Sequence, residues 1–72
     1  MKKLINNKET PLYYIVYNKE GNHYSHGALS LGQELGTNDR NEIYEYRDLE
    51  KFLQEYFDFT GVDLKEDFEI DN

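Results

Sequence analysis

The sequence predicts an α+β domain in which an antiparallel sheet is covered by one amphipathic helix. Three observations carry this prediction: an aromatic and β-branched run, "LYYIVY" (12–17), a helical apolar stripe over 49–57, and alternating apolar and charged residues over 62–70. A chain of 72 residues has room for one hydrophobic core. We therefore expect the order β-β-β-α-β: a three-stranded antiparallel meander, a helix on one face, and a C-terminal strand at an edge.

The first strand is expected over 12–17, where apolar residues of both parities are typical of a central strand covered on both faces. In the following "NKEGN", Asn18 can open a turn and Gly21 can adopt the left-handed conformation, so the next strand should begin near His23. Pro11 is the sole proline. We expect residues 1–11 to form a poorly ordered N-terminal segment, and residues 12–72 to form a single domain.

The second and third strands follow from weaker signals. Leucines over 29–35 alternate with small or polar residues, which favours a strand that continues from His23 and bends at Gly27 or Gly32. A competing interpretation is a capping box that opens one helical turn at Ser30, but it has too few apolar positions. The turn-rich "GTNDRN" (36–41) should return the chain into a third strand, "EIYEY" (42–46).

The helix has both a start and a stop signal. Asp48 can cap its N-terminus and Gly61 can end it. The residues of one broad apolar stripe lie between them, at Leu49, Phe52, Leu53, Tyr56 and Phe57. A helix of about twelve residues is marginal alone in water, so this stripe should be buried against the sheet. We expect Phe52, Phe57 and Phe68 to be core residues.

The C-terminal segment alternates strictly. Val62, Leu64, Phe68 and Ile70 share one parity with the single exception of Glu66, and the other parity is almost entirely charged. Strand is the preferred interpretation, since a helical template matches only Leu64 with Phe68. A capping box formed by Asp63 and Glu66 is the alternative.

The charge is concentrated in one half of the chain. The net charge is -7, but residues 42–72 hold eleven acids against three bases, a net charge of -8. Direct binding of nucleic acid needs a basic surface, so we do not expect it. A partner attracted by electrostatics should be basic. No apolar run approaches the roughly 20 residues of a membrane span, and the N-terminus lacks the apolar region of a signal peptide, so we expect a soluble cytoplasmic protein without membrane contact.

No motif predicts a catalytic, cofactor-binding or metal-binding residue, and we expect no enzyme activity. His23 and His26 have a metal-site spacing, but on a strand they would point to opposite faces. We expect one to pack beside Tyr13 or Tyr17 and the other to be solvated. The glycines lack a phosphate-loop pattern, the acids lack an EF-hand pattern, and neither serine lies in a nucleophile motif.

The chain is rich in tyrosine, with seven. Because one helix covers one sheet face, we expect tyrosines to line the uncovered face as a protein-binding surface. We expect some of Tyr13, Tyr17, Tyr24, Tyr44 and Tyr46 there; the alternative is that exposed tyrosines simply tolerate water.

The acidic half is the basis of a function hypothesis. On a strand, Asp67, Glu69 and Asp71 would form a row of charges about 6.6–6.8 Å apart, and the outer helix face would add a second cluster. Such an array fits a basic, nucleic-acid-binding surface of a host protein, as a nucleic-acid mimic would. The chain is similar in size and charge to small acidic phage proteins that inhibit restriction, repair or CRISPR enzymes, a similarity that transfers no site. The candidate partner-binding residues are Glu50, Glu55, Asp58, Asp63, Asp67, Glu69, Asp71, Tyr44 and Tyr46.

Two alternatives stay open. The first is a structural or assembly protein that self-associates, for example as a homodimer, through a tyrosine-rich sheet face or a free strand edge, with acidity serving solubility alone. The second is a small metal-binding protein or enzyme built around His23 and His26.

Overall fold

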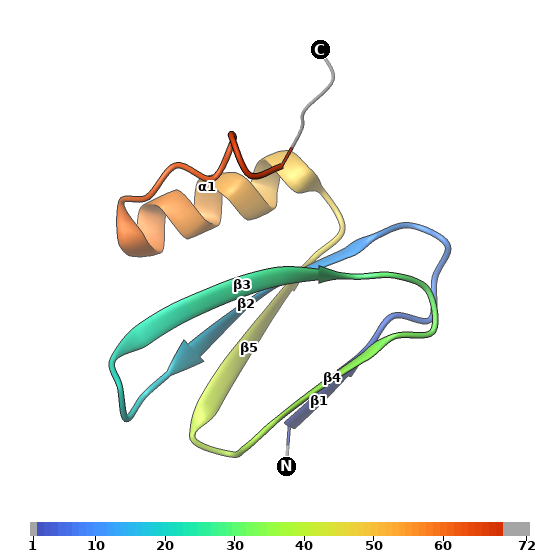
Figure 1. Cartoon of the computed structure of the whole chain (residues 1–72), viewed down its shortest axis with the longest axis horizontal. Helices are drawn as coiled ribbons and strands as arrows, with labels where there is room; N and C mark the ends of the chain where they lie inside the picture. The colour runs from blue at the N-terminus through green and yellow to red at the C-terminus, as the bar shows by residue number, and fades with distance from the viewer. Residues whose placement is uncertain (1, 69–72) are drawn as a thin grey trace.

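The computed structural model describes residues 2–68 and confirms the α+β class (Figure 1). An antiparallel sheet has the strand order β3-β2-β5, and a two-stranded antiparallel sheet pairs β1 with β4. One helix covers a face of the larger sheet. The elements are β1 (Lys2–Ile5), β2 (Leu12–Asn18), β3 (His23–Leu29), β4 (Glu34–Thr37), β5 (Asn41–Tyr46) and α1 (Leu49–Thr60).

The strand order corrects the predicted meander, because β5 pairs with β2 and not with β3. The expected long strand from His23 to residue 35 is interrupted after Leu29. Gly32 adopts a left-handed φ of 84°, and the Ser30 N–H donates to Oε1 of Gln33 at 2.6 Å. This turn directs β4 away from the larger sheet to pair with β1, and the chain then returns on the other side of β2. β2 is therefore the central strand and β3 an edge strand.

The ordered domain begins before Pro11, at β1. Asn6, which follows β1, is fully buried. Its Nδ2 donates to the Leu29 carbonyl at 2.7 Å, and its Oδ1 accepts from Nη1 of Arg47 at 2.8 Å. These bonds satisfy a buried amide and attach the N-terminal segment to both β3 and the end of β5. The poor order expected for residues 1–11 does not hold for β1.

Two apolar clusters lie on opposite faces of the larger sheet. Ile15 packs beneath the helix, whereas Leu12, its neighbour Leu29 and Leu4 of β1 form a second cluster on the other face. This arrangement explains why both parities of "LYYIVY" are apolar, as predicted for a central strand. The cluster beneath the helix consists of Ile15, Phe52, Leu53, Tyr56 and Leu64.

The helix begins and ends where the sequence predicts. The Asp48 side chain accepts from the Glu50 N–H at 3.0 Å, and Gly61, at φ 76°, donates its N–H to the Phe57 carbonyl at 2.7 Å. The prediction that Phe57 is a core residue is wrong, because 48% of its surface is exposed. At about 100° per residue, Phe57 lies roughly 90° from the centre of the buried face. Phe59, which was not predicted, packs against the core instead.

The predicted C-terminal strand is wrong over 62–68, which contains no strand. The N–H groups of Asp67 and Phe68 donate to the Leu64 carbonyl at 2.9 and 3.2 Å, so the chain forms one tight turn. This turn brings Leu64 and Phe68, four residues apart, onto the same side. Leu64 is buried, and the Phe68 ring lies 5.2 Å from that of Phe52. Ile70 lies outside the described residues.

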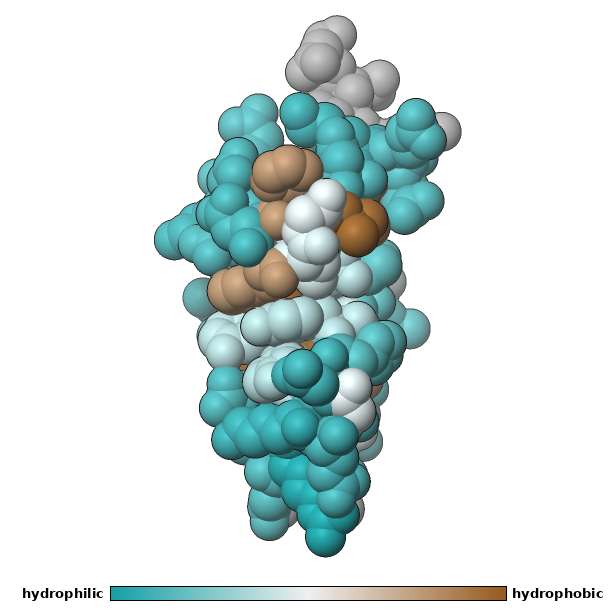
Figure 2. Space-filling view, turned by 90° about the vertical axis from the view of Figure 1, so that its left-hand side faces the viewer, coloured by the Kyte–Doolittle hydropathy of each residue, from teal (hydrophilic) through white to brown (hydrophobic). Residues whose placement is uncertain are grey.

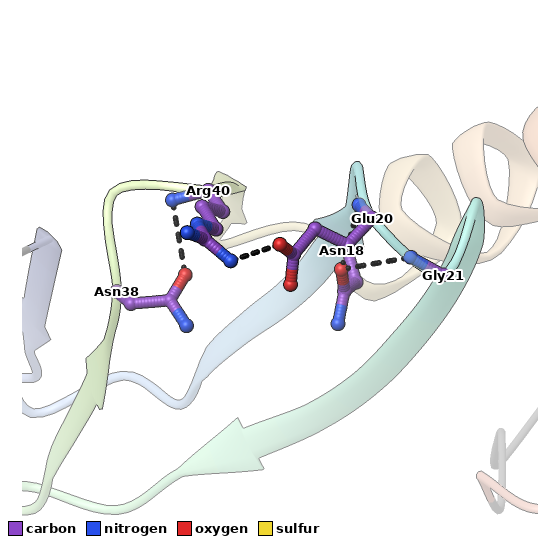
Figure 3. Close-up of polar contacts among 5 residues, drawn as sticks. All are labelled: Asn18, Glu20, Gly21, Asn38 and Arg40. Carbon is purple, nitrogen blue, oxygen red and sulfur yellow. Dashed lines mark hydrogen bonds and ion pairs between the residues drawn. The ribbon is translucent and has the colours of Figure 1, made fainter.

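The β2–β3 and β4–β5 turns are joined at one end of the sheet (Figure 3). Oδ1 of Asn18 accepts the N–H groups of Glu20 and Gly21 at 3.0 and 3.2 Å, and Oδ1 of Asn38 accepts that of Arg40 at 2.9 Å. Arg40 forms an ion pair with Glu20 across the two turns. The left-handed residue of the β2–β3 turn is Asn22, at φ 52°, and not Gly21 as expected.

Candidate functional site

The five tyrosines expected on an uncovered face lie instead on the helix-covered face of the sheet, which corrects that expectation, whereas Tyr14 lies on the other face. Tyr24 stacks on Phe59 of the helix at 5.2 Å and on Tyr17 at 4.6 Å, and Tyr44 lies 5.3 Å from Phe59. Strand parity explains the result, because these tyrosines share the parity and pairing register of the buried Ile15. The tyrosines therefore act mainly as core residues beneath the helix.

Tyr44 and Tyr46, both predicted to contact a partner, are half-buried in this layer. The Tyr44 hydroxyl donates to Oε2 of Glu42 at 2.7 Å, which raises the pKa of Tyr44 to about 12 and lowers that of Glu42. Burial, assisted by the charge of Glu55, raises the pKa of Tyr46. Both tyrosines are thus neutral at physiological pH, and their position indicates a supporting role.

An exposed apolar patch lies at the C-terminal end of the helix. Phe57 and Val62 are 48% and 49% exposed, and they flank the glycine that ends the helix. Figure 2 views this end of the molecule and shows apolar side chains gathered near the top, with paler side chains below and hydrophilic residues around them. We name the exposed pair Phe57 and Val62 the helix-end patch.

Carboxylates border the helix-end patch at an electrostatically unfavourable place. Asp58 lies in the last turn of the helix, Asp63 follows two residues after Gly61, and the last turn contains no basic residue. The C-terminus of a helix carries partial negative charge, so acids there destabilise the fold by roughly 0.3–1 kcal/mol each. Neighbouring donors offset part of this, since Gln54 Nε2 donates to Asp58 and the Lys65 N–H to Asp63, both at 3.0 Å.

The other predicted acids are distributed over the helix and the segment after it. Glu50 is exposed in the first turn, Glu55 is half-buried, and Asp67 is exposed in the turn after Leu64. Segment 62–68 returns along the helix (Figure 1), because Phe68 contacts Phe52 near the helix start. The acidic residues of this segment therefore lie near those of the helix. They form no regular row, since the segment is not extended, and Glu69 and Asp71 lie outside the described residues.

Over the described range 2–68, the ion pairs lie on the strands and their turns. Lys3 bonds Glu34 and Lys19 bonds Glu42, each at 3.0 Å, and Arg40 bonds Glu20. Within that range, none involves an acid of the helix or of segment 62–68. Residues 42–68 alone hold nine acids against three bases.

The two histidines lie on opposite faces of β3, as predicted. The His26 ring packs 4.8 Å from Tyr56 beneath the helix, whereas His23 is exposed. Among residues 2–68, no three His, Asp or Glu side chains are grouped as metal ligands. The histidines therefore give no support to a shared metal site.

The acids were predicted from the sequence, but the exposure of the helix-end patch was not. The signal was present, because Phe57 is the apolar stripe residue farthest from its centre and Val62 follows the C-cap.

Compared with protein-family models, curated proteins and solved structures, the chain matches none of them. In the part of the chain that the structure describes, the helix is too short and polar to cross a membrane.

Proposed function

We propose that this protein is a non-enzymatic module that binds a basic surface of another protein through α1 and segment 62–68, which together we name the helix layer. The observation that supports this most is the joint exposure, at the end of the helix, of an apolar patch and of two carboxylates that form no ion pair within residues 2–68. Phe57 and Val62 would enter an apolar pocket of the partner, while Asp58 and Asp63 would face its lysines and arginines. Residues that lower the stability of the folded state are typical of binding sites.

The two parts of this surface have different roles. Large exposed apolar side chains at the centre of an interface usually contribute most of the binding free energy, and Phe57 is the best placed to do so. Charges at the rim mainly raise the association rate and select partners of opposite sign. A surface with Asp58 and Asp63 at the helix end that exposes Phe57 therefore favours a partner with basic residues around an apolar pocket.

The proposal does not include mimicry of a regular phosphate array. That hypothesis required Asp67 to continue an extended row, and Asp67 instead follows a tight turn. A basic surface that normally binds nucleic acid is still the partner class proposed, since its charge complements the helix layer. Recognition would then depend on Phe57 as well as on charge.

The test compares charge-matched variants in affinity capture from the source cell, followed by titration calorimetry with the captured protein. We expect Asp58→Asn with Asp63→Asn to weaken binding about tenfold and to reduce its salt dependence. The control, Glu9→Gln with Glu34→Gln, removes equal charge far from the patch and should change affinity less than about threefold. Phe57→Ser should weaken binding by tenfold or more while thermal stability is retained.

Two results would contradict the proposal. One is binding whose affinity does not change between low and high salt. The other is an equal loss of affinity in the Glu9 and Glu34 control, because the helix layer would then have no special role.

A further inference from the structure

β3 is an edge strand, and among residues 2–68 its outward backbone groups form no hydrogen bond. All seven of its residues pair with β2 without a bulge. The N–H of Lys19 donates to the Arg40 carbonyl at 3.2 Å, which fixes the alternation of the β2–β5 ladder. It follows that Ser25 and Gly27 direct their backbone groups to β2. The backbone groups of Tyr24, His26 and Ala28 point outward.

This edge lacks the devices that usually prevent strand pairing. Natural edges are short, bulged, charged or interrupted by proline. β3 is seven residues long, "HYSHGAL", and contains neither proline nor Asp, Glu, Lys or Arg. The other edges differ. β4 is four residues long and carries Glu34, while β5 carries Glu42 and Glu45 and contacts β1.

Because β3 carries no charged residue, the partner that we expect at this edge is a second copy of the chain. Two copies of a chain with a net charge of -7 repel each other, and their acids are concentrated in the helix layer. β3 itself carries no carboxylate, so a second copy can pair with this strand without like charges facing each other along the paired residues. A basic partner, by contrast, would be attracted to the helix layer. We propose that the protein forms a two-fold symmetric dimer by antiparallel pairing of β3 with β3 of a second copy.

One register uses the edge fully. A two-fold axis at His26 places Tyr24 opposite Ala28 of the second copy, and His26 opposite His26. Each of these pairs can exchange both N–H···O bonds, because the outward groups coincide. A shift of two residues leaves one of the outward positions without a partner. The His26-centred register also places the small Ala28 beside the Tyr24 ring.

The dimer would contain one continuous sheet with both helices on the same side. The helix-end patch is exposed at the helix C-terminus, and the dimer would present two such patches for the proposed partner. Because the contact is small, we expect a dissociation constant on the order of 10 μM, which is typical of weak interfaces. Since both copies are acidic, salt should strengthen the dimer. Salt should weaken binding of a basic partner, so failures of the two proposals can be distinguished.

The test is sedimentation equilibrium of the full chain from about 5 to 500 μM, together with amide hydrogen exchange by NMR. We expect a monomer–dimer equilibrium. At low concentration the amides of Tyr24, His26 and Ala28 should exchange fast and those of Ser25 and Gly27 slowly. At high concentration all five should be protected.

Ala28→Pro removes an outward N–H while the bonds of β3 to β2 are retained, because proline is tolerated at a strand edge. We expect it to weaken the dimer at least tenfold. Ala28→Val, the control, keeps the N–H and should retain dimerisation. A monomer at all concentrations would overturn the proposal. So would a dimer whose Tyr24, His26 and Ala28 amides stay fast, since it would associate elsewhere.

Discussion

Phe52 and Phe57 occupy the same helix, and replacing each by alanine should have very different effects. Phe52 is fully buried, with the rings of Tyr13 and Phe68 at 5.3 and 5.2 Å and that of Tyr46 at 6.0 Å. Truncating a buried phenylalanine costs about 3–5 kcal/mol. Each aromatic pair contributes roughly 0.5–1.5 kcal/mol beyond its buried area, so we expect the upper end of this range for Phe52→Ala.

Such a loss is large for a chain of this size. At about 0.05–0.15 kcal/mol per residue, its free energy of unfolding should be roughly 4–11 kcal/mol. Phe52→Ala would therefore remove a large share of this stability, and at the lower end of the range it would unfold the protein at 25 °C. Phe57→Ala makes the same chemical change in the same helix, so the difference in helix propensity is similar. Because Phe57 is half exposed, we expect it to lose less than about 1 kcal/mol.

Urea denaturation followed by circular dichroism and tyrosine fluorescence measures both losses. Phe52→Leu provides an intermediate variant that still folds, with an expected loss of about 1–2 kcal/mol. Equal losses for Phe52→Ala and Phe57→Ala would refute the reasoning, since the helix would then be rotated relative to the sheet. The comparison also shows whether Phe57 variants can be used safely in binding experiments.

Two further predictions concern the sheet. A Cβ at Gly27 would lie 2.6 Å from Cζ of its cross-strand neighbour Tyr14. Gly27→Ala should therefore lower the free energy of unfolding by about 1–3 kcal/mol. In a double-mutant cycle measured by urea denaturation, adding Tyr14→Ser to Gly27→Ala should recover most of this loss. The pKa of Tyr44 is raised to about 12 by its bond to Glu42, so this bond stabilises the fold below pH 10 and the stabilisation is lost as pH rises toward 12. Tyr44→Phe should remove the latest tyrosine step in an ultraviolet titration and raise the pKa of Glu42 measured by NMR; an unchanged titration would contradict the assignment.

Local signals predicted the helix and the central strand well. Asp48 and Gly61 act through contacts within a few residues, so the sequence alone contains the information. The two-sided apolar pattern of 12–17 likewise reflects cover on both faces. The partner of a strand depends on the whole chain. The turn at Gly32 directs β4 to β1, and no local pattern predicts that β5 then pairs with β2.

β1 was missed because its signal is short and mixed. Lys2–Ile5 has a single buried side chain, Leu4, and its order depends on distant partners. Leu35 of β4 faces it across the small sheet, and the buried Asn6 is bonded to Leu29 and Arg47. These contacts join residues tens of positions apart. A propensity argument restricted to residues 1–11 could not include them.

The acidic charge of the candidate site was predicted from the sequence, but the exposed apolar side chain within it was not. Counting acids identified the helix layer, because net charge is independent of conformation. The apolar anchor depends on the rotation of the helix, which decides that Phe59 is covered and Phe57 is exposed. A rotation of less than one residue would exchange the two roles. Exposed aromatic residues at the margin of a stripe therefore need coordinates to be recognised.

Segment 62–68 shows why strict alternation was not sufficient for a strand. A strand needs a neighbour for its backbone, and an added strand would place Asp63, Lys65 and Asp67 along an edge of the sheet. The turn instead satisfies backbone groups locally through the Leu64 carbonyl and buries Leu64 and Phe68 together against the helix cluster. Glu66, the exception to the alternation, lies exposed in this turn. A strand would have placed Glu66 on the buried side. The same turn leaves the carboxylates of the segment beside those of the helix, so the packing of two apolar side chains determines where the acidic surface forms.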